Sequence, residues 1–296
     1  MKKKKLIIVL LFILVVLSSI FLYVTVRFDL FKNTEEVVVV PEEKEETKPE
    51  IDDKYTKLRQ RWNANKQIND DYVGEIVFDS GIIDLSFVKA DDVYDSNGNQ
   101  YIFYDIDGNV ITDMEEGCDG YSCSGNDVYL WTYWKTMEYD KFDNGGSVFM
   151  DYRNSLNDEN LIIYGHHFSI EYNPERDKAF TCLENFVNKD YYEDNKYLSL
   201  VLDGEIRRYE IASVYRCDIY DEAAEYYRTS YNYDFDGYED PGYKERYFEH
   251  IKDIEYYDTG VDLNGGDYTL TLQTCFSGEP DYREILVCKQ IEVIRG

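Results

Sequence analysis

The feature that most constrains this 296-residue chain is an apolar segment close to its N-terminus. Leu6 to Val26 forms a run of 21 residues without a charged side chain, and Lys2 to Lys5 precede it. About 20 such residues span the hydrocarbon core of a bilayer, so the segment is predicted to be a transmembrane anchor. Because positive charge favours the cytoplasmic side, we expect residues 1–5 inside the cell and the chain after about residue 27 outside it. A cleavable signal peptide is the alternative, but its apolar region is usually only about 7–15 residues long.

The charge balance excludes several classes of partner. The chain carries 60 acidic and 31 basic residues, a formal net charge of -29. Because 44% of the residues are hydrophobic and 16% aromatic, these acids must cover a folded core and do not form a disordered polyanion. Such a surface repels phosphate backbones and anionic headgroups, so no nucleic-acid partner is expected and membrane attachment must come from the N-terminal helix. Residues 27–50 read as an acidic flexible stalk, which leaves residues 51–296 as one extracytoplasmic domain.

The pattern after the stalk predicts a mainly β domain with two longer helices. Helices are expected at Asp52–Gln67, where Tyr55, Leu58 and Trp62 share one face, and at Pro241–Tyr256. Short β-branched and aromatic runs separated by turn residues predict strands at Glu75–Asp79, Ile82–Val88, Tyr101–Tyr104, Ser147–Asp151, Asn160–Tyr164, Tyr197–Leu202, Ile206–Arg216, Tyr268–Thr274 and Glu284–Val293. These elements predict a β-barrel or sandwich decorated by helices.

The cysteines and acidic turns do not predict a metal site or a cofactor. The six cysteines show no framework spacing, although a Cys118–Cys123 bridge stays open, and we expect Cys182, Cys217 and Cys288 to be small buried side chains. Three histidines and the lack of a CxxC pair argue against structural zinc. The turns at 95–99 (DSNGN) and 105–109 (DIDGN) resemble the start of calcium loops, but hairpin turns between β-rich runs are the favoured interpretation.

Two short segments carry residues suited to nucleophilic catalysis. One is Asn160–Phe168, a strand that runs into a glycine followed by two histidines, and the other is Tyr268–Cys275, an alternating strand that ends in a cysteine. Arg283 opens the next predicted strand. A thiol becomes a strong nucleophile when an imidazole takes its proton, and a guanidinium, which stays charged, can stabilise an oxyanion. Taken singly, each residue has an ordinary structural explanation, but the three together favour a catalytic site.

These segments resemble the signature of the sortases, membrane-anchored cysteine transpeptidases of Gram-positive bacteria. The family's TLxTC strand is matched by Thr271–Cys275, its glycine–histidine pair by Gly165–His166, and its strand-opening arginine by Arg283. The similarity covers roughly residues 70–293 and is greatest to class B. In that class a helix precedes the barrel, and a connection with its own helix, here Asp218–Asp267, precedes the nucleophile strand. Asp91–Gly145 departs from the family pattern and looks like an insertion.

The resemblance implies a sortase-like closed β-barrel and a two-step transpeptidation without a cofactor. Cys275 would be the nucleophile, His166 the general acid and base, and Arg283 the group that stabilises the oxyanion or the substrate. Gln273, Thr274 and Phe276 would line the substrate groove. The implied partners are secreted proteins bearing a C-terminal sorting motif, and a cell-wall peptide stem or its lipid-linked precursor as the amine acceptor.

Two other functions remain open from the sequence. A thiol peptidase that only hydrolyses would use the same three residues, because the choice between water and an amine depends on the shape of the groove. A non-enzymatic, membrane-tethered adhesin would keep the anchor and the β-fold. In that case Cys275 would be buried and distant from His166.

Overall fold

The computed structural model describes residues 51–118, 120–136, 142–168, 179–218, 242–276 and 279–295. The predicted cytoplasmic tail, membrane segment and stalk, residues 1–50, lie outside the described residues. Within the described ranges, no helix combines the length and the apolar character needed to cross a membrane. The chain divides at Pro49, and the second unit, Glu50–Gly296, holds every element described below.

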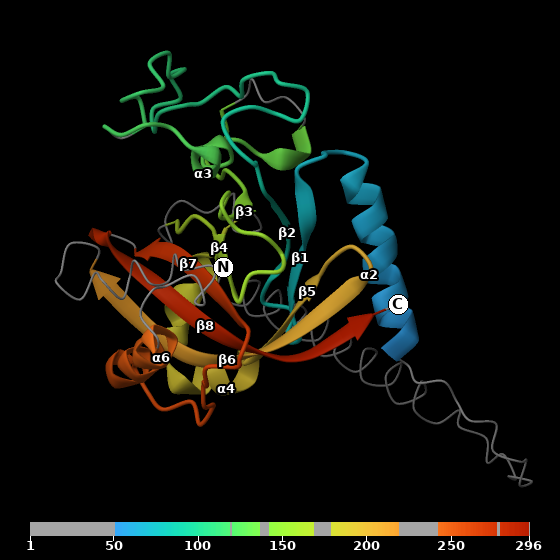
Figure 1. Cartoon of the computed structure of the whole chain (residues 1–296), viewed down its shortest axis with the longest axis vertical. Coiled ribbons are helices and arrows are strands. Elements are labelled where there is room, and N and C mark those ends of the chain that lie inside the picture. Colours follow the sequence, from blue (N-terminus) through green and yellow to red (C-terminus); the bar gives the residue numbers. More distant parts are fainter. Residues whose placement is uncertain are drawn as a thin grey trace, which may run out of the picture. The chain divides into compact units, whose positions relative to one another are not determined.

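Eight strands form a closed barrel in the order β1-β2-β3-β4-β7-β8-β6-β5 (Figure 1). The strands are β1 (Tyr72–Phe78), β2 (Asp84–Val88), β3 (Val148–Met150), β4 (Asn160–Tyr164), β5 (Tyr197–Val201), β6 (Glu205–Asp218), β7 (Thr269–Phe276) and β8 (Glu279–Arg295). Most neighbours are antiparallel, whereas β2–β3 and β4–β7 are parallel. Pairing of β1 with β5 closes the barrel, so the prediction of a closed β-barrel is confirmed.

Alternation along β8 explains how one strand serves two cores. Leu286 and Cys288 join the hydrophobic cluster that fills the barrel and draws residues from all eight strands. Ile285 and Val287 point the other way and pack with side chains of the helix that covers this part of the barrel. Because successive side chains of a strand point to opposite faces, the continuous apolar run at the end of the chain is fully buried on both sides.

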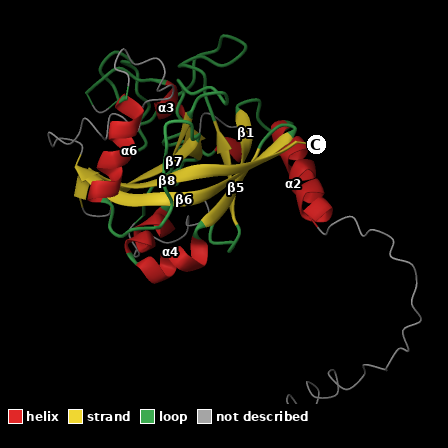
Figure 2. Ribbon diagram, turned by 60° about the horizontal axis from the view of Figure 1, so that its bottom comes forward, coloured by secondary structure: helices red, strands yellow, loops and turns green. Residues whose placement is uncertain are grey.

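Helices cover the barrel from several sides (Figure 2). They are α2 (Ile51–Lys66), α3 (Gly125–Val128), α4 (Lys189–Asn195) and α6 (Tyr243–Ile254), with short 3-10 helices η1 (Trp134–Thr136) and η3 (Thr181–Val187). Trp62 of α2 donates to the Val73 carbonyl of β1 at 2.8 Å, which fixes the helix to the barrel wall. Helix α6 packs on β6 and β8 through the buried side chains of Tyr247, Phe248 and Ile251. Both predicted helices are therefore confirmed to within two residues at each end.

One predicted strand is wrong. Residues 101–104 form no strand, and an isolated bridge joins Tyr104 to Val110. Tyr101 and Phe103 are instead buried in a second hydrophobic cluster with Tyr129 and Trp134, outside the barrel. The aromatic pattern thus reflects burial of these side chains without a partner strand to complete a ladder.

The region predicted as an insertion, residues 91–145, packs as a small structure against β1, β2 and β3 at the top of Figure 1. The acidic sequences at 95–99 and 105–109 form tight turns, as predicted, each closed by an isolated bridge and without flanking strands. The carboxylates of Asp95 and Asp105 accept backbone N–H groups within each turn. The disulfide that the sequence left open is present between Cys118 and Cys123.

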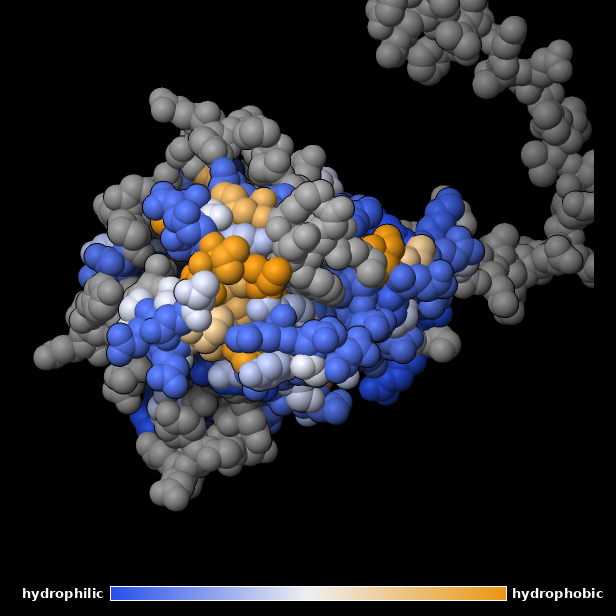
Figure 3. Space-filling model, turned by 90° about the horizontal axis from the view of Figure 1, so that it is seen from above, coloured by the Kyte–Doolittle hydropathy of each residue, from blue (hydrophilic) through white to orange (hydrophobic). Residues whose placement is uncertain are grey.

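Seen from above, the described residues present a mostly hydrophilic face with a compact hydrophobic area near the centre (Figure 3).

The disulfide closes a loop of only a few residues, so its contribution to stability should be modest. For a loop this short, the chain-entropy model gives a loss of about 2 kcal/mol in the free energy of unfolding when the bridge is removed. We expect the double variant Cys118→Ser/Cys123→Ser to lose no more than this in denaturant unfolding of the full chain. A much larger loss would mean that the bridge organises the whole 91–145 region.

Candidate active site

Cys275 lies near the end of β7 and is exposed, unlike Cys217 and Cys288, which are buried as predicted. In the antiparallel β7–β8 ladder Cys275 is the direct partner of Arg283. Residues that face each other in such a ladder project to the same side of the sheet, so the thiol and the guanidinium share one face. This is the outer face, because Ile285 and Val287, which follow Arg283 in alternation, pack outside the barrel with α6.

His166 reaches the same region from the other side of β7. The parallel β4–β7 ladder ends with Tyr164 opposite Gln273, and the Gly165 N–H continues it by donating to the Gln273 carbonyl at 3.1 Å. The Thr274 hydroxyl donates to the Gly165 carbonyl at 2.7 Å. The next residue along each chain is His166 on one side and Cys275 on the other. The topology therefore brings the three predicted residues to adjoining positions on three neighbouring chain segments.

Gly165 makes this close approach achievable. A Cβ added to Gly165 would lie 2.7 Å from Cγ of Phe180, a fully buried ring of the barrel core. Phe180 in turn donates its backbone N–H to the His166 carbonyl at 2.8 Å. The glycine before the histidine is thus explained by packing against Phe180, and a larger residue would displace the segment that carries His166.

Aromatic rings and one carbonyl group surround the His166 side chain. Its Nε2 hydrogen-bonds to the Leu130 carbonyl, and its ring lies 4.7 Å from Trp131 and 5.7 Å from Phe168, centroid to centroid. Burial lowers the pKa of His166 below its ordinary value, while the Leu130 carbonyl and the negative charge of Asp143 act in the opposite direction. The imidazole is therefore mainly neutral at neutral pH, the form that can accept a proton.

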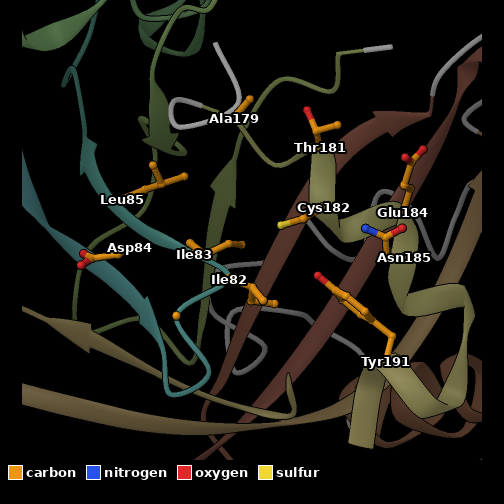
Figure 4. A pocket seen from close by; sticks show the side chains of 11 residues that line it. Ile82, Ile83, Asp84, Leu85, Ala179, Thr181, Cys182, Glu184, Asn185 and Tyr191 are labelled. Atoms are coloured by element: carbon orange, nitrogen blue, oxygen red, sulfur yellow. The ribbon is translucent and has the colours of Figure 1, made fainter. Parts of the chain in front are cut away.

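His167, the neighbour of His166 in the chain, points to a different environment. Its Nε2 pairs with the Glu184 carboxylate at 2.9 Å. Glu184 also lines a cavity of about 540 Å³ between the β1–β2 connection and the η3–α4 segment (Figure 4). The Cys182 side chain lines this cavity too and is only half-buried against the barrel core, so the prediction that Cys182 is a small buried side chain holds only in part.

Behind Arg283, on the inner face, lies a buried carboxyl group. Glu284 is fully buried, and its Oε2 accepts from the Tyr256 hydroxyl at 3.1 Å and from Nε of Arg216 at 3.4 Å. Its Oε1 has no hydrogen-bond partner among the described residues. Burial raises the pKa of Glu284 to about 7, although Tyr256 and Arg216 favour the charged form. The group is therefore largely protonated in the folded protein below neutral pH.

The three residues predicted to line a substrate groove are not equally placed for it. Gln273 and Thr274 are almost fully buried, 3% and 2% exposed, and the Thr274 hydroxyl is already bound to Gly165. The side chain of Phe276 lies outside the part of the chain that the structure describes. Direct contact of Gln273 or Thr274 with a substrate would require their exposure, and a substrate-binding role for all three residues stays a prediction.

Sequence reasoning missed Leu130, Trp131 and Glu284. A backbone carbonyl carries no residue-type signal, and Trp131 lies in the segment whose role the sequence did not assign. Glu284 is adjacent to Arg283, but it is one of 60 acidic residues, and its position beside the site could not be recognised without the strand register. The buried position of Glu284 could have been inferred from its alternation with Leu286 and Cys288.

The closed eight-stranded barrel, with a cysteine at the end of β7 between a histidine-bearing segment and an arginine, is the arrangement that the resemblance to the sortases led us to expect. No family model matches the sequence. The chain is 28% identical over 154 residues to sortase B of Staphylococcus aureus and 31% identical over 166 residues to sortase B of Listeria monocytogenes. These matches cover 50% and 54% of this chain, and 56% and 57% of the two relatives, so the chain spans little more than half the length of each.

Comparison with solved structures extends the likeness over most of the domain. A mutant form of sortase B from Clostridium perfringens superimposes with a TM-score of 0.58 at 23% identity, covering 81% of this chain and 91% of that one. At this identity the comparison establishes the fold. The chain thus has the sortase fold, and in sequence it is similar to sortase B.

We expect Gly165→Ala to destabilise the protein by about 1–3 kcal/mol, because the new methyl group must push against the buried Phe180 ring. Denaturant unfolding of the full chain measures this change. Gly266→Ala is the matched control, since a Cβ there would meet no atom within 4 Å. Equal stability of the two variants would contradict the packing explanation for Gly165.

The raised pKa of Glu284 predicts a stability that depends on pH. Between its ordinary pKa and about 7 the unfolded chain is ionised while the folded protein keeps the proton, so stability falls as pH rises through this window. Glu284→Gln should therefore match the wild type near pH 5 and be more stable near pH 8, by at most about 3 kcal/mol. Urea unfolding at the two pH values tests this. An advantage that is the same at both would show that ionisation of Glu284 is not its cause.

Proposed function

We propose that the chain is a sortase-type cysteine transpeptidase of class B character. The observation that carries the proposal is the exposed Cys275 on β7, with Arg283 opposite it on β8 and the His166 segment hydrogen-bonded alongside. A nucleophile, a group that exchanges protons and a fixed positive charge are the three requirements for acyl transfer through a thioester. The similarity to sortase B supports the same conclusion.

In the first step Cys275 transfers its proton to His166, and the thiolate sulfur attacks the carbonyl carbon of the scissile peptide bond. The carbonyl oxygen becomes an oxyanion, which the Arg283 guanidinium stabilises by charge and hydrogen bonding. His166 then returns the proton to the departing amine nitrogen. The C–N bond breaks, and the acyl group remains on Cys275 as a thioester.

In the second step an amine attacks the thioester, and His166 accepts the proton that this amine loses. The same oxyanion forms again beside Arg283 and collapses by breaking the C–S bond, and the released Cys275 thiolate takes the proton back from His166. One peptide bond is broken and one is formed, so the reaction needs no cofactor and no external energy source. The lowered pKa of His166 supports this role, because a neutral imidazole is required to begin each step.

The proposed substrates follow from the family resemblance. The acyl donor is a secreted protein with a C-terminal sorting motif, and the acceptor is the amine of a cell-wall peptide stem or of its lipid-linked precursor. Gln273, Thr274 and Phe276 remain proposed contacts to the donor. We further propose that residues 6–26 anchor the enzyme with residues 1–5 in the cytoplasm, that 27–50 form the stalk, and that 51–296 act at the outer face of the membrane.

The two alternatives stand differently against the structure. A non-enzymatic adhesin would leave Cys275 buried and remote from His166, whereas the thiol is exposed and its neighbours in register are Arg283 and the His166 segment. This observation argues against the adhesin. A peptidase that only hydrolyses would use the same arrangement, and the experiment below separates it from a transpeptidase.

The test is cleavage of a small library of quenched sorting-motif peptides by the full chain in mild detergent, with and without an added amine. We expect cleavage of at least one peptide, an amine-linked product when acceptor is present, and loss of both in Cys275→Ala. Arg283→Lys should lower turnover by about 10²–10³ because a point charge cannot replace the planar guanidinium at the oxyanion.

Lys57→Ala is the control for Arg283→Lys. Lys57 is exposed on α2, so this variant removes a positive charge from an element remote in sequence from Cys275, His166 and Arg283. Cleavage without any amine-linked product would identify a hydrolysing peptidase. A lack of turnover of every peptide, together with a Cys275 thiol that resists alkylation, would overturn the enzyme proposal.

A further inference from the structure

The segment 129–131, inside the region predicted as an insertion, is held by hydrogen bonds against the turn that leads into β3. The Tyr129 carbonyl accepts the N–H of Ser147, and the Trp131 carbonyl accepts the N–H of Asp143, both at 2.9 Å. The carbonyl between them, that of Leu130, receives the ring nitrogen of His166. Three consecutive carbonyl groups therefore take part in hydrogen bonds, and only the middle one contacts a side chain of the proposed active site.

Gly146 makes room for this arrangement. Its φ of +50° lies in the left-handed region, and a Cβ there would come within 2.1 Å of the Leu130 oxygen. Both the backbone angle and the close approach favour glycine at this position. The backbone of Gly146 therefore lies close to the Leu130 carbonyl, and a side chain at this position would displace that carbonyl from His166.

The Leu130 carbonyl determines which His166 nitrogen carries the proton. A carbonyl oxygen only accepts hydrogen bonds, so Nε2 of His166 must be the protonated nitrogen in the neutral ring. Nδ1 is then the nitrogen that accepts and returns a proton. The hydrogen bond made by one ring nitrogen commonly fixes the role of the other in this way.

The Trp131 ring adds a second restraint. It lies 4.7 Å from the His166 ring at an interplanar angle of 36°, and its own position is supported by Phe142 at 6.0 Å. Trp131 thereby covers a face of the imidazole that would otherwise contact water. The Leu130 carbonyl limits translation of the ring, and the Trp131 face limits its rotation about χ2.

We propose that the Leu130 carbonyl and the Trp131 ring form a positioning clamp for His166. The clamp holds the ring in the Nε2–H tautomer, so that Nδ1 is the nitrogen that accepts and returns the proton. The inference rests on the proposed function, because it assigns this task to the catalytic histidine. It gives residues 91–145 a part in catalysis, although none of them is proposed to touch substrate.

The electrostatic surroundings of His166 are consistent with the clamp. Asp143, on the chain segment that fixes Trp131, favours the charged imidazolium, and Arg283 and Cys275 lie on the adjoining strands. His167 and Glu184 pair with each other on the η3 side. Removing the Trp131 ring admits water to the imidazole, so the pKa of His166 should rise toward its ordinary value while Asp143 continues to act in the same direction.

The experiment compares Trp131→Ala with Trp131→Phe in the full chain. Nitrogen NMR of labelled histidine reports tautomer and titration directly, and the chain has only three histidines, which His167→Gln and His250→Gln assign. We expect Trp131→Ala to raise the His166 pKa, to mix the two tautomers and to lower kcat for peptide cleavage at least tenfold with little change in KM. Trp131→Phe should restore most of each property.

Trp134→Phe controls for a general loosening of the segment, because Trp134 is buried in the cluster that also holds Tyr129 and Leu130, and it packs on Tyr72 and Tyr133. It should lower stability without moving the His166 signals. If Trp131→Ala leaves the tautomer, the titration and kcat unchanged, the clamp is refuted. If the wild type cleaves no peptide yet Trp131→Ala still shifts the His166 signals, the clamp stands and the proposed function fails.

Discussion

The parallel pairing of β4 with β7 is the constraint on which the rest of the site depends. Antiparallel neighbours can be joined by a tight turn, but parallel strands so far apart in the chain meet only when the intervening barrel is complete. The pairing runs through Gly165, which is bonded to both Gln273 and Thr274. The segments that carry His166 and Cys275 therefore lie side by side because of long-range strand pairing and not because of any local segment.

The two faces of the β7–β8 ladder divide the chemistry. On the outer face Cys275 and Arg283 are accessible, whereas on the inner face Thr274 and Glu284 are buried beside the barrel core. The same alternation separates His166, which contacts Leu130, from His167, which contacts Glu184. A shift of either strand by one residue would exchange these sets and bury the thiol, so register is what distinguishes the accessible Cys275 thiol from a core cysteine such as Cys288.

Much of this arrangement could be predicted from the sequence, because the decisive segments are strongly patterned. The strand Asn160–Tyr164 was predicted with its observed bounds, and the Thr271–Cys275 motif marked the nucleophile strand. The error at 101–104 arose where an alternating pattern is buried by packing alone, outside any sheet. The partners of His166 could not be predicted, because Leu130 acts through a backbone carbonyl and Trp131 reaches the ring only through the fold of residues 91–145.

The buried Glu284 and the neutral His166 have a common consequence for Arg283. A carboxylate next to the guanidinium in the chain would offset part of its charge in a region of low dielectric constant, where such offsets are large. Burial raises the pKa of Glu284 to about 7, so below neutral pH the carboxyl group is mainly protonated and this offset is small. Burial also lowers the pKa of His166, so the resting imidazole is neutral and adds no fixed positive charge beside the thiol before the reaction begins. Desolvation of two groups of opposite type therefore leaves Arg283 as the fixed charge beside the thiol, which is the electrostatic condition that stabilisation of an oxyanion requires.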